Sequence, residues 1–358
     1  MTDARAAREA AHAWMAANRD RWPGLRAAHF VGSLTSLPDD APFPAAKDID
    51  IHLVFDETSP ALIPTGPFAE IVEEPAGAWV IEGGIKSVAE YVSPEAVLAN
   101  PETAHHLTAD SILHDPSHLL ARLQGPVRAD YAKRRWVAAR LAHERRAYAE
   151  VRGMLPMVMR QNGVSGGVLF LGYLMTFPTA SFGVAALGPP SGGSGTLVHL
   201  RTAMRAHGRG DLYDDLLKVL GMARTSPDEA RAELATTAEI FDEAVAVRRS
   251  PHPFQHKLHT HLRPYLVGSV TRMIEEGDHR EGLAWAVPYR LASLDVLRAD
   301  GDAGAKIEAA RRQEAFLASM GFTDLGAVEE RLVQAELLYG AMFDLADETA
   351  RTNPAIVD

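Results

Sequence analysis

The sequence predicts an α+β fold in which a small domain with a mixed β-sheet is followed by a larger domain made only of helices. Short segments with alternating apolar and polar residues, typical of strands, occur between residues 25 and 92. Beyond Ser93 and Pro94, the apolar residues recur at helical spacing. Because 358 residues can fill two cores, we expect an α/β domain over residues 1–125 and a helical domain over residues 126–358.

The first domain is predicted to begin with a helix and two strands. Residues 3–20 are rich in alanine, with apolar side chains on one side, which predicts an amphipathic helix. Residues 25–32 (LRAAHFVG) predict a short strand that ends at a Gly-Ser pair. After a loop with three prolines, residues 47–55 (KDIDIHLVF) predict a second strand. Its apolar face is expected to carry Ile49, Ile51 and Leu53, and its polar face Asp48, Asp50 and His52.

Two further strands are predicted over residues 78–82 and 85–92. The pair Gly83-Gly84 lies between them and is a typical hairpin turn signal. The helical pattern that follows predicts helices separated by Gly- and Pro-containing stops. Their expected ranges are 94–110, 117–124, 127–152, 196–208, 211–221, 227–248, 255–276, 280–298, 303–318 and 323–348.

The composition, with 47% hydrophobic and 23% charged residues, is that of a soluble globular protein. A net charge of -11 argues against a nucleic-acid-binding surface, which needs clustered Lys and Arg. The lack of cysteine excludes disulfides and thiolate metal sites. Residues 161–200 carry no Asp, Glu, Lys or Arg, but Pro178 and several glycines are expected to divide them into pieces too short for a membrane span. We therefore expect a cytoplasmic protein without membrane or nucleic-acid partners.

Asp48 and Asp50 form the most informative chemical pattern in the chain. Strand geometry places both carboxylates on one face, roughly 7 Å apart along the strand. Mg²⁺ prefers oxygen ligands and commonly takes one or two carboxylates together with substrate phosphates. We therefore expect these two aspartates to bind Mg²⁺.

Gly32 and Ser33 are predicted to supply a phosphate-binding turn after the first strand. Glycine permits close approach of the backbone to a phosphate, and the Ser33 hydroxyl and nearby N–H groups can hold it. A third carboxylate is expected nearby, either as a metal ligand or as the base for an attacking hydroxyl. Glu90 is the first candidate because it interrupts an apolar strand face, and Glu82 is the alternative.

These residues resemble the pattern of the DNA polymerase β-type nucleotidyltransferase superfamily. That pattern is Gly-Ser, a loop, Asp-hydrophobic-Asp-hydrophobic on a strand, and a later acidic residue, carried here within residues 30–92. The resemblance implies that Asp48 and Asp50 bind Mg²⁺, that Gly32 and Ser33 cradle a triphosphate, and that Glu90 is the third carboxylate. Two features depart from the pattern: the loop between Ser33 and Asp48 is long, and Lys47 stands where a small hydroxyl residue is common. Lys47 is therefore a candidate phosphate contact.

The segment 112–123 (ILHDPSHLLARL), followed by a long helical region, resembles the aminoglycoside and antibiotic nucleotidyltransferase branch of that superfamily. In this branch the helical domain helps to form the acceptor cleft, and sites shared across a dimer are known. The resemblance therefore implies that residues 126–358 contribute to an acceptor cleft, and it allows a homodimer.

The leading hypothesis is a Mg²⁺-dependent transfer of a nucleoside monophosphate, with ATP as the first candidate donor, to a hydroxyl of a small antibiotic-like or natural-product-like acceptor, releasing pyrophosphate. Two alternatives stay open. The same chemistry could act on a protein or RNA, or the chain could be a decayed scaffold that binds a nucleotide or a partner without catalysis. The sequence leaves the identity of the triphosphate and of the acceptor open.

Overall fold

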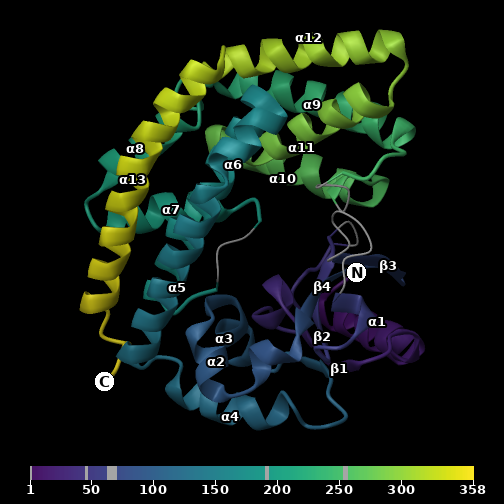
Figure 1. Cartoon of the computed structure of the whole chain (residues 1–358), viewed down its shortest axis with the longest axis vertical. Helices are drawn as coiled ribbons and strands as arrows, with labels where there is room; N and C mark the ends of the chain where they lie inside the picture. Colours follow the sequence, from purple (N-terminus) through teal and green to yellow (C-terminus); the bar gives the residue numbers. More distant parts are fainter. Residues whose placement is uncertain (1, 45–46, 63–70, 190–192, 253–256) are drawn as a thin grey trace. The chain divides into compact units, whose positions relative to one another are not determined.

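The chain divides into two compact units in the computed structural model, which describes residues 2–44, 47–62, 71–189, 193–252 and 257–358 (Figure 1). The first unit comprises Met1–His143, Leu187–Pro190 and Pro354–Asp358, and the second Glu144–Ala186 and Ser191–Asn353. The first unit contains a mixed sheet and the second is helical, which confirms the α+β class in general terms. The division falls later than residue 125, because helix α4 (Ala121–Asp130) contributes Leu123 and Val127 to the core under the sheet.

The sheet has five strands in the order β3-β4-β2-β1-β5. Strands β2 and β4 pair in parallel, and the other neighbours pair antiparallel, so the sheet is mixed. The strands are β1 (Leu25–Phe30), β2 (Ile49–Phe55), β3 (Ile71–Ala76), β4 (Trp79–Ser87) and β5 (Ile112–His114).

Both faces of the sheet are covered, as the long run of buried residues in β2 requires. Helix α1 (Ala4–Asn18), whose N-terminus is capped by Asp3, buries Ala7, Ala11 and Trp14 in one core with Ile51. The opposite face, which carries Val54, is covered by three short helices. These are α2 (Pro94–Ala99), α3 (Pro101–Leu107) and α4.

The predicted hairpin at Gly83-Gly84 is wrong, because both glycines lie inside the continuous strand β4. The turn lies instead at Gly77, which has φ +64° and joins β3 to β4. Gly84 serves packing, since an added Cβ would lie 3.2 Å from Cδ2 of His52. The expected strand 85–92 also ends early, because Val88–Tyr91 form a 3-10 helix.

The chain returns to the first unit at its C-terminal residues. Val357 forms a parallel β-bridge with Lys133, and its carbonyl accepts a hydrogen bond from Arg134 N at 2.7 Å. Ile356, the residue before Val357, is buried. The sheet unit is therefore assembled from segments that lie more than two hundred residues apart.

The second unit contains most of the long helices expected from the apolar spacing, and six of the seven expected after residue 195 lie within four residues of their predicted ends. The expected helices 127–152 and 255–276 begin only at Arg134 and Arg263, and the helix Leu155–Ala185 was not among the expected ranges. Helix α6 packs along α13, and α9 packs along α11. The start of the expected helix 255–276 falls partly on residues 253–256, outside the described residues. The helices are α5 (Arg134–Gly153, which begins in the first unit), α6 (Leu155–Ala185), α7 (Thr196–Ala206), α8 (Gly210–Val219), α9 (Pro227–Val247), α10 (Arg263–Glu275), α11 (His279–Asp300), α12 (Ala303–Ser319) and α13 (Leu325–Thr352).

Helix α6 corrects the expectation that Pro178 and the glycines cut residues 161–200 into short pieces. It runs for 31 residues, with Pro178 inside it and a non-helical backbone only at Gly163. The helix is long and apolar enough to span a membrane, but 61% of its most apolar window is buried within the protein. A core helix shows such burial. Packing along α13 stabilises α6, and this tertiary packing is the reason that a proline within the helix is tolerated.

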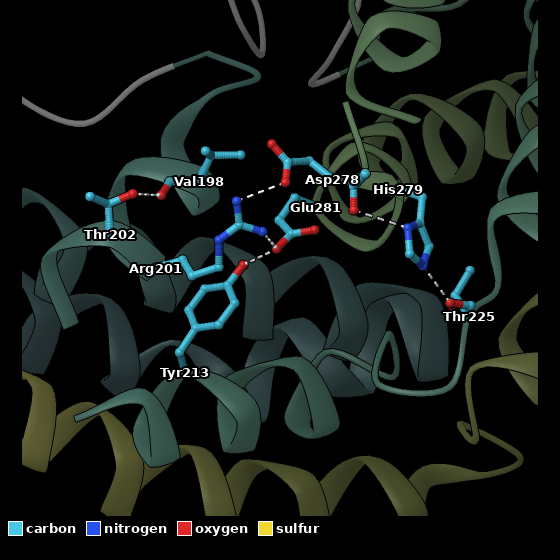
Figure 2. Close-up of polar contacts among 9 residues, drawn as sticks. Val198, Arg201, Thr202, Tyr213, Thr225, Asp278, His279 and Glu281 are labelled. Atoms are coloured by element: carbon cyan, nitrogen blue, oxygen red, sulfur yellow. Dashed lines mark hydrogen bonds and ion pairs between the residues drawn. The ribbon is translucent and has the colours of Figure 1, made fainter. Parts of the chain in front are cut away.

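A cluster of charged side chains joins α7, α8 and α11 within the second unit (Figure 2). Arg201 donates to Asp278 and to Glu281, both at 2.7 Å. The hydroxyl of Tyr213 also donates to Glu281 at 2.7 Å. Glu281 is only 3% exposed, so this carboxylate is buried together with its own cation and donor.

Candidate metal centre

Three carboxylates meet at the N-terminal end of β2. Asp48 immediately precedes the strand, Asp50 is its second residue, and Glu82 on β4 pairs directly with Asp50 in the parallel register. Directly opposed residues in neighbouring strands place their side chains on the same face. One carboxylate oxygen of each residue lies within 4.8 Å of the others. The expected association of Asp48 and Asp50 is therefore present, and Glu82 joins them.

This group matches the donor set of a hard divalent cation. Ligands held about 2.1 Å from Mg²⁺ lie roughly 3 Å apart when adjacent and roughly 4 Å apart when opposite. The three oxygens are close enough to reach such positions by small side-chain rotations. Asp48 is 8% exposed, and the other two residues are half-buried, which leaves room for ligands from a substrate. The residues present thus fit Mg²⁺.

Gly32 is held directly against the Asp50 carboxylate. The amide of Val31 donates to the carbonyl of Asp50 at 3.0 Å, which ties the end of β1 to the start of β2. Gly32 then has φ +62°, a region that favours glycine. An added Cβ at this position would lie 2.5 Å from Oδ2 of Asp50. Glycine is therefore required both by the backbone conformation and by the carboxylate beside it.

Ser33 and Lys47 are joined across the loop that separates them. Ser33 lies in a 3-10 turn over Gly32–Thr35, and Lys47 Nζ donates to its Oγ at 2.6 Å. The same ammonium lies 5.2 Å from the centre of the Phe43 ring. Burial lowers the pKa of Lys47, while attraction to Asp50 and Asp48 opposes that shift. A cation is thus held at the turn, whose Gly32 lies against the Asp50 carboxylate.

Glu90 lies outside this group. It was expected on a strand, but it belongs to the 3-10 helix Val88–Tyr91, where it accepts a hydrogen bond from the Ser87 amide at 3.3 Å. Ser87 Oγ caps the same helix in return, so the pair forms a capping box. The alternative candidate, Glu82, is the acidic residue that lies with the aspartates. Glu82 lies opposite Asp50 because of the parallel register between β2 and β4, for which the sequence carries no signal.

Buried histidines lie on the same sheet face as Asp50. His52, two residues along β2, has its Nε2 3.2 Å from Oε1 of Glu102, and its ring centre lies 5.1 Å from that of His29. Burial lowers the pKa of His29 well below its usual value and lowers that of His106 to about 3. These two imidazoles are therefore neutral at physiological pH. The sequence placed His52 on the aspartate face but gave no signal that His29 and His106 join it.

No protein-family model, curated protein or solved structure matches this chain. The likeness to polymerase β-type nucleotidyltransferases is therefore carried by the Gly-Ser and Asp-x-Asp patterns of the sequence. Any functional conclusion depends on the geometry of these residues.

Proposed function

We propose that the chain is a Mg²⁺-dependent nucleotidyltransferase that moves a nucleoside monophosphate from a nucleoside triphosphate to a hydroxyl group. The observation that carries the proposal is the meeting of Asp48, Asp50 and Glu82 within 4.8 Å, directly against the Gly32 turn. Carboxylates gathered in this way suit a cation that also binds phosphate oxygens.

The proposed roles follow from where each residue lies. Asp48, Asp50 and Glu82 would hold Mg²⁺, and Ser33 and Lys47, which already contact one another, would hold the terminal phosphates together with the Gly32 backbone. Mg²⁺ bound there would neutralise charge that develops on the phosphate oxygens and keep the reacting groups in line. Lys47 supplies a positive charge at the same place, as a point charge on a flexible stem.

The proposed reaction is a single displacement at phosphorus. The acceptor's hydroxyl oxygen bonds to the α-phosphorus, the bond to the oxygen bridging the α- and β-phosphates breaks, and pyrophosphate leaves. The hydroxyl proton would pass to Glu82, for which the carboxylate oxygen that does not bind the metal is the candidate acceptor, since each residue offers one ligand atom to the ion. In this role Glu82 replaces the originally expected Glu90.

We propose a small hydroxylated molecule as the acceptor and ATP as the first donor to test. The net charge of -11 disfavours a polyanionic acceptor such as RNA, since phosphate binding needs clustered positive charge. A labelled protein band after incubation with radiolabelled ATP and a cell lysate would instead indicate that the acceptor is a protein.

The decisive experiment is calorimetric titration of each nucleoside triphosphate in Mg²⁺. Wild type is expected to bind one of them, and the double variant Asp48→Asn/Asp50→Asn is expected to lose that binding. Pyrophosphate release with a panel of hydroxylated acceptors should fall about a thousandfold or more in the double variant, since metal ions contribute several kcal/mol to such reactions.

Glu90→Gln is the matched control, because it neutralises a nearby acidic residue that lies outside the carboxylate group. It is expected to bind triphosphate as wild type does. Loss of binding in this control would return the third carboxylate to Glu90. Failure of folded wild type to bind any triphosphate, with and without the acceptor panel, would overturn the proposed function.

A further inference from the structure

We propose that the Lys47 ammonium balances part of the negative charge of Asp48, Asp50 and Glu82. As a result, the site binds one divalent ion, not two, before the triphosphate binds. This inference rests on the proposed metal site and assigns a role to a side chain that departs from the resembling family's pattern. Two-metal sites use a second ion to neutralise carboxylates and to clamp phosphate oxygens. Lys47 is placed to serve both purposes.

The position of the ammonium supports the first purpose. Lys47 directly precedes Asp48, and its hydrogen-bond partner Ser33 follows Gly32, which lies against the Asp50 carboxylate. Its Nζ is held by the Ser33 hydroxyl at 2.6 Å and lies over the Phe43 ring at 5.2 Å, so the stem is fixed at both sides. A lysine that merely extended into solvent would show neither contact. The ammonium is therefore held at the Ser33 turn, next to the residue that lies against Asp50.

The formal charges support a single ion. Counted at their formal charges, three carboxylates and one ammonium carry two negative charges, which one divalent cation balances. A second divalent ion would meet a site without net negative charge and with a fixed ammonium already in place. Repulsion between a divalent ion and a nearby ammonium is worth more than about 1.4 kcal/mol at partly buried positions, which corresponds to about tenfold in affinity.

The contact with Ser33 supports the second purpose. Gly32 and Ser33 form the turn at which we propose the triphosphate binds, and Lys47 lies within hydrogen-bond distance of its hydroxyl. An ammonium has three donors and can exchange this partner for a phosphate oxygen without moving far. Lys47 would thus contact the phosphates where a second ion otherwise would.

The test counts Mn²⁺ ions bound by the full chain in the absence of nucleotide, by electron paramagnetic resonance. Wild type is expected to bind one ion per chain. Lys47→Met is expected to bind either a second ion or the first about tenfold more tightly, because a positive charge has been removed. Lys47→Arg keeps the charge and should bind one ion, as wild type does. Triphosphate affinity should fall about tenfold in Lys47→Met and recover in Lys47→Arg.

Lys86→Met is the matched control for removing a lysine from the same sheet unit. Lys86 is paired with Glu102 at 3.2 Å and lies four residues along β4 from Glu82, so its loss should leave the number and affinity of Mn²⁺ ions unchanged. Thermal unfolding of every variant shows whether it is folded.

The outcomes separate this inference from the proposed function. If wild type binds triphosphate but holds two Mn²⁺ ions, or if Lys47→Met binds Mn²⁺ as wild type does, the role of Lys47 is overturned and the proposed function stands. If folded wild type binds neither Mn²⁺ nor triphosphate, both fail. If Lys86→Met changes Mn²⁺ binding as much as Lys47→Met, the effect is one of overall charge and the role of Lys47 is again overturned.

Discussion

The sheet unit and the helical unit each bring charged side chains together, and the two groups differ in how their charges are balanced. In the helical unit, Arg201 lies between Asp278 and Glu281, and Tyr213 donates a further hydrogen bond (Figure 2). In the sheet unit, three carboxylates converge within 4.8 Å, with Lys47 as a neighbouring cation. The first group pairs unlike charges, and the second concentrates like ones.

This difference is the one expected between a group of structural ion pairs and the metal-binding group that we propose. A buried carboxylate that has its own arginine is stabilised as it stands, and removing one partner leaves a costly charge behind. Carboxylates held together by strand pairing repel one another, and a divalent ion relieves that repulsion when it binds. The same kind of substitution should therefore have opposite effects on stability in the two regions.

The largest effect on stability is expected from Arg201→Met. It leaves Glu281, which is 3% exposed, without its cation, and it should lower the free energy of unfolding by about 3 kcal/mol. Asp50→Asn, measured in a chelator, should leave that free energy unchanged or raise it, because it removes one of several like charges. Urea unfolding followed by circular dichroism measures both. Equal destabilisation by the two variants would remove the contrast between the regions.

A smaller effect is expected from Gly32→Ala, which tests whether the turn supports the carboxylates. Alanine at φ +62° is strained, and its Cβ would displace the Asp50 carboxylate, so the variant should lose about 2 kcal/mol and weaken Mn²⁺ binding about tenfold. Gly77→Ala is the matched control, since Gly77 has φ +64° but its added Cβ would come no closer than 3.8 Å, to Ala10. It should lose about 1 kcal/mol and bind Mn²⁺ normally.

If Mn²⁺ affinity falls equally in both glycine variants, the loss reflects backbone strain alone. The turn at Gly32 would then have no specific part in positioning Asp50.

The effect that is smallest near neutral pH, and that grows with acidification, is a pH dependence contributed by the sheet unit. Burial lowers the pKa of His106 to about 3, below the ordinary histidine value near 6.5, so the unfolded chain binds a proton that the folded chain does not. Stability should therefore fall with acidification between about pH 6.5 and pH 3, by about 1.4 kcal/mol per pH unit from this residue. His106→Gln should reduce that slope in urea unfolding between pH 7 and pH 5. An unchanged slope would show that His106 takes up its proton in the folded protein.

The sequence was a good guide to the helices and a partial one to the sheet. Apolar spacing predicted most helices of the second unit, because each buries one stripe of side chains against a neighbour. It did not predict α6, whose prolines and glycines indicated breaks that the helix does not make. Strands β3 and β5 were missed, since Ile71–Ala76 contains two glutamates and a proline and Ile112–His114 is only three residues long. The pair Gly83-Gly84 was read as a turn because local propensity does not reveal that His52 fills the space beside Gly84.

The site residues that could be predicted are those in a local sequence pattern, and those that depend on long-range pairing could not. Asp48, Asp50, Gly32 and Ser33 are close in sequence or linked by a recognisable spacing, so they could be predicted together. The third carboxylate depends on the register between β2 and β4, which the single sequence does not reveal, and Glu90 was therefore preferred to Glu82. The contact of Lys47 with Ser33 likewise depends on how the intervening loop folds.

The return of the chain to the sheet unit affects the order in which the protein can be made. Residues 32–82, which carry the candidate site, leave the ribosome early, and domains generally fold as units during synthesis. Yet Val357 pairs with Lys133 and Ile356 is buried in the same unit, so the sheet unit stays incomplete until the helical unit has been synthesised. A chain that is truncated inside the helical unit would therefore contain every residue of the candidate site but would lack the C-terminal residues that complete the sheet unit.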